Sequence, residues 1–132
     1  MTEDIFRSYD IRGRYPEKVN EKIIEQIAYA CGKVLRGRIV IARDIRLSSP
    51  QLLRSVVKGL KRAKVRHITE AGVATTPMFY FLVNRERASG GLMVTASHNP
   101  KEYNGLKVVG KGAEMIGGGT VLNFVKRYPH ET

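Results

Sequence analysis

Residues 91–107 of the chain read Gly91-Leu-Met-Val-Thr-Ala-Ser-His-Asn-Pro-Lys-Glu-Tyr-Asn-Gly-Leu-Lys107. The apolar run Leu92-Met-Val94 predicts a buried strand, because a short apolar run bounded by turn residues is typical of one. The polar residues Thr95 to Pro100 predict a tight loop, and Asn104-Gly105 predicts a second turn. The stretch therefore places Ser97 in a loop directly after a buried strand.

The side chains around this loop are of the kinds that phosphoryl transfer needs. Ser97 is followed at once by His98 and Asn99, and Lys107 comes ten residues later. A hydroxyl can carry a transferred group, while imidazole, amide and ammonium groups can hold an anion or move a proton. The pattern indicates a site where a serine handles phosphate.

The rest of the chain alternates between helical and extended patterns. Apolar spacing predicts helices at Val19–Leu35 (beginning near Pro16 or Asn20), Ser49–Ala63 (Ser49-Pro50 as its N-cap), Thr76–Arg87 and Thr120–Tyr128. Buried strands are expected at Ile39–Ala42 and Leu92–Val94, and further strands at Val65–Thr69 and Leu106–Val109, the last antiparallel because its connection is too short for a crossover. This alternation predicts an α/β fold of three α/β/α layers with a mixed, mostly parallel sheet, and ligands beyond the carboxyl ends of its strands.

Composition narrows the class of protein. The 132 residues suffice for one domain with a buried core, and no apolar run approaches the ~18 residues of a membrane span. The net charge of +11 comes from scattered lysines and arginines, so solvated faces and a phosphate-handling cleft are favoured over nucleic-acid binding. The single cysteine, Cys31, excludes an internal disulfide, suits the cytoplasm and is expected in the core. His67 and His130 have no metal-spaced partner and are given no role.

Thr95-Ala-Ser-His-Asn-Pro100, followed by Tyr103-Asn-Gly-Leu-Lys107, resembles the active-site serine loop of the alpha-phosphohexomutases. This family comprises phosphoglucomutases, phosphomannomutases and phosphoglucosamine mutases. Three other segments resemble family motifs: Phe6-Arg-Ser-Tyr-Asp-Ile-Arg-Gly13, Arg43-Asp-Ile-Arg-Leu-Ser-Ser49 and Gly72-Val-Ala-Thr-Thr-Pro77. The resemblance extends from about Ile5 to Ile116.

The resemblance implies four catalytic residues. Ser97 would be the phosphoserine that exchanges its phosphoryl group with a hexose phosphate, through a hexose 1,6-bisphosphate intermediate. Its phosphate would also ligate Mg²⁺. His98 would contact phosphate or orient the loop, Lys107 would act beside the reacting hydroxyl, and Arg12 would grip phosphate with its planar fork.

Other residues of these motifs are expected to contact substrate or to support the local structure. Tyr9 and Asn99 are expected to contact substrate, although Asn99 is also a turn residue. Asp10 is interpreted as an anchor of its segment. Asp44, Arg46 and Ser48 are interpreted as structural residues that fix a turn and a helix start.

The chain also departs from the family pattern. Family enzymes are several times longer, and the second of their four domains holds magnesium with a D-G-D-G-D-R loop, whereas Asp4, Asp10 and Asp44 here are not clustered. We expect residues 1–116 to be the first domain, and 117–132 to be a hinge at Gly117-Gly-Gly119 and a helix leading toward the second. Domains II–IV would come in cis or in trans.

Two classes of function remain open. The chain is either the catalytic-serine domain of an isomerase, or a stand-alone module that binds phosphate, a phosphosugar or a partner without turnover. No cofactor is expected to bind tightly to the chain alone. An apolar surface that a second domain would cover is expected around Gly117–Gly119 and the final helix, with either self-association or a mobile C-terminal segment as the result.

Overall fold

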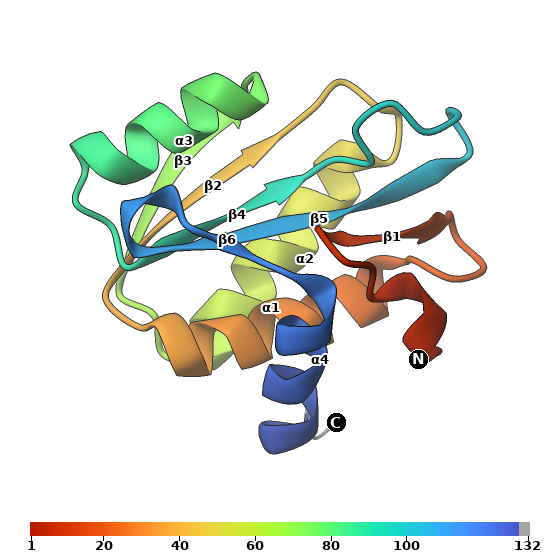
Figure 1. The fold of residues 1–132 in the computed structure, drawn as a ribbon, viewed down its shortest axis with the longest axis horizontal. Coiled ribbons are helices and arrows are strands. Elements are labelled where there is room, and N and C mark those ends of the chain that lie inside the picture. The colour runs from red at the N-terminus through yellow and green to blue at the C-terminus, as the bar shows by residue number, and fades with distance from the viewer. Residues whose placement is uncertain (130–132) are drawn as a thin grey trace.

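The computed structural model describes residues 1–129 of the chain, and Figure 1 shows how their helices and strands are arranged. The strands are β1 (Ile11–Arg14), β2 (Arg38–Arg43), β3 (His67–Val73), β4 (Gly90–Val94), β5 (Tyr103–Gly110) and β6 (Met115–Ile116). The helices are α1 (Glu21–Leu35), α2 (Ser49–Arg62), α3 (Thr76–Arg85) and α4 (Gly118–Arg127), with the short 3-10 turns η1 (Glu3–Ile5) and η2 (Lys111–Ala113).

The strands form one mixed sheet in the order β1-β5-β4-β2-β3, and β6 also pairs with β5. β2 lies parallel to β3 and to β4, whereas β5 is antiparallel to β1, β4 and β6. Within residues 1–129, β5 is thus the only strand that runs against the others. The sheet is mixed and mostly parallel, as predicted, and β5 is antiparallel to β4 as its short connection required.

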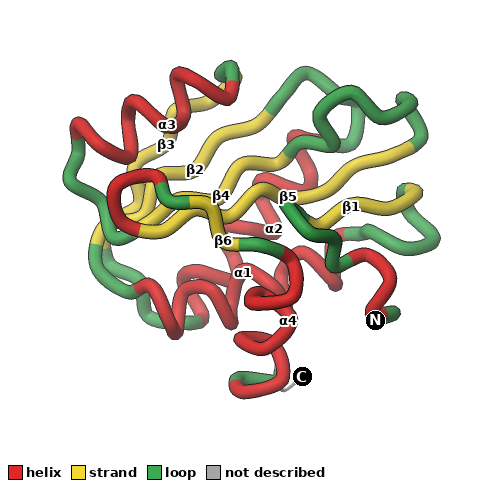
Figure 2. Tube along the Cα trace, in the orientation of Figure 1, coloured by secondary structure: helices red, strands yellow, loops and turns green. Residues whose placement is uncertain are grey.

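Helices cover both faces of this sheet. α1, α2 and α4 lie below the sheet and α3 lies above it in the view of Figures 1 and 2. Two apolar clusters fill the two gaps. The larger joins α1 and α2 to the sheet, and the smaller joins Phe79 and Val83 of α3 to Val40 and Met93. The arrangement confirms the predicted three-layer α/β/α fold.

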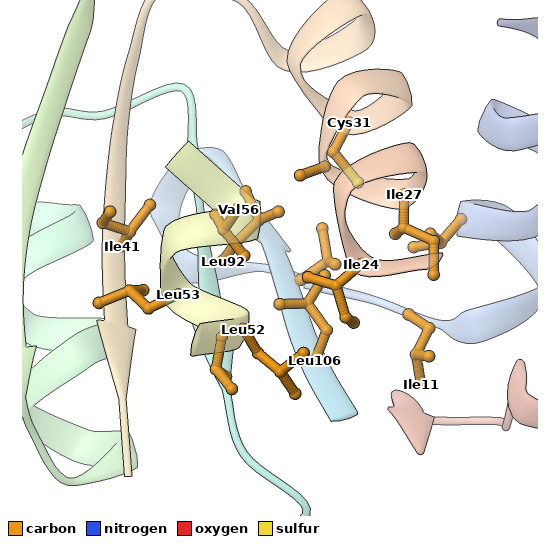
Figure 3. Packing of buried hydrophobic residues seen from close by; sticks show 14 of the residues in the cluster. Ile11, Ile24, Ile27, Cys31, Ile41, Leu52, Leu53, Val56, Leu92 and Leu106 are labelled. Atoms are coloured by element: carbon orange, nitrogen blue, oxygen red, sulfur yellow. The ribbon is translucent and has the colours of Figure 1, made fainter. Parts of the chain in front are cut away.

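The larger cluster explains the apolar periodicity of the first two helices. Ile24, Ile27 and Cys31 of α1 belong to the same apolar cluster as Leu52 and Val56 of α2, and Figure 3 shows the packing of this cluster. α1 begins where the side chain of Asn20 accepts a hydrogen bond from the amide of Ile23 (3.0 Å). The predicted packed core thiol at Cys31 is confirmed, since the residue is fully buried.

Some local predictions were wrong. Asn104-Gly105 is not a turn but part of β5, where Asn104 is fully buried and pairs with Gly13 of β1. Ser49 is the first residue of α2 and not its N-cap, which is Ser48, and the Ser49 hydroxyl donates to the carboxylate of Asp44. β1 and β6 were not expected, because neither has a long apolar run of its own.

The last helix folds back onto the domain. Val121 of α4 is fully buried, and Phe124 and Val125 pack partly buried against the larger cluster beside α1. The amide of Gly118 donates to the carbonyl of Arg7 (2.7 Å), so the glycine segment is packed closely against the N-terminal segment. The division at residue 117 and the hinge remain predictions, and residues 130–132, including His130, lie outside the described part.

Candidate functional site

The serine loop follows β4, at the end of the sheet where the carboxyl ends of the parallel strands lie. Ser97 and His98 are exposed, and Ser97 adopts a left-handed backbone conformation with φ of +57°. Non-glycine residues rarely adopt this conformation, and it is often found at functional sites. The amide of Ser97 donates to the hydroxyl of Thr95 (3.0 Å), which fixes the start of the turn.

Arg46, from the loop between β2 and α2, anchors the serine loop by hydrogen bonds to its main-chain carbonyls. Its Nη2 donates to the carbonyl oxygens of Ser97 (2.9 Å) and Asn99 (2.7 Å), and its Nη1 donates to those of Pro100 (2.7 Å) and Tyr103 (3.1 Å). The two loops lie side by side at the same end of the sheet in Figure 1. Four main-chain carbonyls on one guanidinium replace the regular hydrogen bonds that a loop lacks.

Arg46 is itself held by Asp44. Arg46 Nε donates to Asp44 Oδ2 (3.2 Å), while Asp44 Oδ1 accepts from the amide of Arg46 (3.1 Å) and from the hydroxyl of Ser49. The amide nitrogen of the buried Asn104 side chain donates to the hydroxyls of Ser48 (2.8 Å) and Ser49 (3.0 Å). The network ties β5 to the start of α2. The structural role that the sequence analysis gave Asp44, Arg46 and Ser48 therefore extends to the serine loop itself.

A buried carboxylate joins the two predicted cations. Asp10, whose side chain is 3% exposed, lies 3.1 Å from Arg12 Nε and 3.7 Å from Lys107 Nζ. The N–H of Arg12 is not directed at the Asp10 oxygen, so neither of these two buried atoms has a hydrogen bond within residues 1–129. Both cations still reach water, with side chains 29% and 20% exposed. They can therefore meet a ligand while the buried anion holds them.

Strand register places these cations beside the serine loop. The amide of Thr95 donates to the carbonyl of Gly105 (3.1 Å), and Gly105 pairs with Arg12 on β1. Lys107 lies two residues further along β5, and side chains two apart on a strand share a face. No hydrogen bond or ion pair links Ser97 directly to Arg12 or Lys107 in the part of the chain that the structure describes.

The remaining predicted contacts lie near the same edge. Tyr9, directly before Asp10, is 63% exposed. The side-chain amide of Asn99 donates to the carbonyl of Ala96 (2.9 Å), so it closes the turn in this structure. The sequence analysis gave no site role to Asp10 and only a local one to Arg46. Both stand in recognised motifs, but their long-range contacts are not visible in the sequence.

Two hollows in the surface bear on where a ligand could lie. One of about 200 Å³ lies behind the serine loop and is lined by Tyr15, Leu47, Ser48, Gln51, Lys101 and Glu102. Another of about 390 Å³ lies at the ends of α1 and α2 and is lined by none of the predicted site residues. Neither hollow is lined by Ser97, His98, Arg12 or Lys107. A surface loop with convergent cations suits a site that further polypeptide would close.

The described residues do not form a magnesium site of their own. Within residues 1–129, no three His, Cys, Asp or Glu side chains lie close enough together to hold a metal ion. Asp10 and Asp44 are already engaged with Arg12, Lys107 and Arg46. Magnesium prefers several oxygen ligands, so it does not fit these residues alone. In the same range, no helix combines the length and apolar character of a membrane span.

Comparisons with known proteins agree with this arrangement. The family profile for phosphoglucomutase/phosphomannomutase, alpha/beta/alpha domain I, matches residues 3–121. A protein of Xanthomonas campestris named Phosphohexose mutases is 42% identical over 127 residues, which are 96% of this chain but 28% of that protein. A Phosphomannomutase of Klebsiella pneumoniae is 39% identical over 127 residues, covering 96% of this chain and 80% of that protein.

A solved structure shows the same fold. The crystal structure of a phosphoglucomutase/phosphomannomutase family protein from Burkholderia thailandensis matches with a TM-score of 0.85 at 32% identity, covering 96% of this chain and 30% of that one. The part of this chain that the family profile matches, residues 3–121, includes the serine loop. The chain therefore belongs to the phosphoglucomutase/phosphomannomutase family and corresponds to its alpha/beta/alpha domain I.

Proposed function

We propose that this domain carries the transferred phosphoryl group on Ser97, as part of a cytoplasmic phosphohexomutase that moves phosphate between the 1- and 6-positions of a hexose. The observation that carries the proposal is the exposed, left-handed Ser97 in a loop beside the Arg12–Asp10–Lys107 cluster. An exposed hydroxyl in an anchored loop, at the end of the sheet where two cations lie, suits a phosphoserine, because cations offset the charge of the phosphate.

The chemistry assigns a task to each group. A hydroxyl of the sugar would attack the phosphorus on Ser97. The new sugar oxygen–phosphorus bond forms as the bond to Ser97 Oγ breaks, and the serine oxygen takes up a proton. The attacking hydroxyl gives its proton to a nearby base; Lys107 is the proposed group, and it would act as the uncharged amine after giving up its own proton. Arg12 and His98 would hold phosphoryl oxygens, and Tyr9 and Asn99 would contact the sugar phosphate.

Magnesium would offset phosphoryl charge in the complete enzyme. Ser97 would contact it through the phosphate, and the remaining ligands would come from outside the described residues. The hexose 1,6-bisphosphate is the proposed intermediate and activator. The names of the relatives agree with a hexose phosphate as substrate, and this chain spans 28% of the Xanthomonas campestris relative.

Phosphorylation of Ser97 is the direct test. The complete enzyme, or this chain supplemented with the remaining domains of a relative, is incubated with hexose 1,6-bisphosphate and analysed by peptide mass spectrometry. We expect one phosphate on the peptide that contains Ser97, and none in Ser97→Ala. Ser8→Ala is a matched control, because Ser8 is an exposed serine outside the loop. Equal labelling of Ser97→Ala would rule out the proposal.

A second function is a module that binds phosphate or phosphosugar without turnover. The observation that favours it is the packing of α4 against α1, which covers Val121 within the chain itself. Under this alternative the serine loop would bind phosphate while Ser97 stayed unmodified. The same mass measurement therefore separates the two functions.

A further inference from the structure

Every N–H group of the Arg46 guanidinium donates a hydrogen bond within the protein. Its Nε donates to Asp44, and each Nη donates to two carbonyls of residues 97–103, so all five N–H groups are used. The side chain is 14% exposed, although it belongs to a surface loop. Such saturation exceeds what a turn or a helix start needs, and the distant acceptors lie in the serine loop (Ser97, Asn99 and Pro100) and at the start of β5 (Tyr103).

The direction of these carbonyls determines where the loop amides point. In a planar trans peptide the C=O and N–H groups point in opposite directions. The carbonyl of Ser97 is drawn toward Arg46, so the N–H of His98 in the same peptide points away from it. The carbonyl of Pro100 has the same effect on the N–H of Lys101. The carbonyl of Asn99 precedes Pro100, which has no N–H, and the carbonyl of Tyr103 shares its peptide with Asn104, which already belongs to β5. Within the loop itself, the amides turned away from Arg46 are therefore those of His98 and Lys101.

The outward amides are available to a ligand. Within residues 1–129, no hydrogen bond from the His98 N–H to a protein acceptor is found, and His98 follows the left-handed Ser97. Amides that converge around a left-handed residue form concavities that bind anions. The exposed Ser97 hydroxyl lies in the same turn. Anchoring the carbonyls on one side thus prepares the other side for phosphate.

We propose that Arg46 is a positioning residue of the phosphate site: by binding the carbonyls of the serine loop it turns the amide of His98 toward the phosphate at Ser97. The inference rests on the proposed function and adds a residue that touches neither phosphate nor sugar. Its planar fork is essential, because a lysine has one charged nitrogen with three donors and cannot span four carbonyls and a carboxylate.

Phosphate binding to variants of this chain tests the proposal. Inorganic phosphate is titrated into ¹⁵N-labelled protein, and the amide shifts of residues 95–103 give the dissociation constant. We expect Arg46→Ala and Arg46→Lys each to weaken binding by on the order of tenfold, the loss of about one charge-assisted hydrogen bond. Arg54→Ala and Arg54→Lys are matched controls, since Arg54 is exposed on α2, and they should bind as the unmodified chain does.

The readouts separate positioning from charge and from folding. Amide shifts outside the loop report whether Arg46→Ala still folds. If Arg46→Ala does not fold, Arg46→Lys still tests the proposal, because it keeps the positive charge but lacks the planar fork. Full affinity in Arg46→Lys would mean that charge alone matters and would overturn the proposal, as would full affinity in Arg46→Ala. Absence of phosphate shifts at the His98 amide of the unmodified chain would also overturn it. None of these outcomes decides whether Ser97 is phosphorylated, so the proposed function is judged separately.

Discussion

At the scale of single residues, the buried Asp10 explains how two cations can stay at one site. Arg12 and Lys107 come from neighbouring strands and would repel each other without an anion between them. A buried carboxylate is costly unless it is paired, so each cation also stabilises Asp10. The site therefore depends on a residue that has little contact with solvent.

Asp10→Asn should destabilise the domain. The substitution keeps the shape but leaves two cations without their anion. Breaking a buried pair costs about 3–5 kcal/mol, and we expect about 1–3 kcal/mol because both cations reach water. Urea unfolding measures the loss. Asp4→Asn is the control: the pair of Asp4 with Lys18 is exposed and should contribute little. Equal effects of the two substitutions would refute this role for Asp10.

Cys31 gives the stability a defined pH dependence. Burial raises the pKa of its thiol from 9.0 to about 12. The folded state then holds a proton that the unfolded state releases, so stability falls as the pH rises above 9. The loss from this group should be about 1.4 kcal/mol between pH 8 and pH 10. Urea unfolding at both pH values should show this difference between the unmodified chain and Cys31→Ala, and parallel pH curves would contradict it.

At the scale of elements, two adjacent glycines in α4 have different surroundings. A Cβ on Gly118 would overlap backbone atoms of Arg7 and Phe6, whereas a Cβ on Gly119 would meet nothing within 4 Å. The close approach at Gly118 brings α4 against the N-terminal segment. The glycine run is thus partly a packing device, in addition to the hinge that its composition predicts.

Gly118→Ala should displace α4 from the domain. Backbone atoms cannot yield as a flexible side chain can, so Val121 would lose its buried position. We expect a loss of about 2 kcal/mol, near the value of exposing one valine. Gly119→Ala should be neutral or slightly stabilising, since alanine favours helix. Thermal unfolding compares the two, and hydrogen exchange in residues 118–127 reports the helix. Similar behaviour of both variants would contradict the packing argument.

At the scale of the whole molecule, the domain presents a serine loop without a magnesium site. The described residues gather no metal-ligand cluster, and the chain covers only 28% of the Xanthomonas campestris relative. We expect this chain alone to show no conversion of hexose 1-phosphate to hexose 6-phosphate. Adding the remaining domains of the Xanthomonas campestris relative as a separate chain should restore measurable turnover. Robust turnover by this chain alone would overturn that expectation.

The exposed apolar side chains predict self-association. Ile45 and Leu47, on either side of Arg46 in the loop between β2 and α2, are 82% and 97% exposed. Met78 and Phe81 are 54% and 62% exposed on α3. Exposed apolar side chains can take part in contacts between protein molecules when they lie together on a surface. We expect the mass measured by light scattering to rise with protein concentration. A constant monomer mass at high concentration would show that these side chains do not drive association.

The sequence by itself determined the three-layer fold and the location of the serine loop. Helix and strand periods are local, and the order of α1, β2, α2 and β4 follows from them. The same is true of the antiparallel β5, since a short connection allows no crossover. These features depend on neighbouring residues along the chain, which is why a single sequence was enough to predict them.

Only the tertiary structure decided how distant segments share hydrogen bonds. The run Asn104-Gly105 has the composition of a turn, yet burial against Ser48 and Ser49 makes Asn104 part of a strand. Arg46 reaches carbonyls more than fifty positions away in the chain. Local patterns cannot reveal such contacts, because an arginine in a polar loop satisfies its donors equally well with water. Folding removes that water, and the guanidinium then binds whichever carbonyls the sheet has placed beside it.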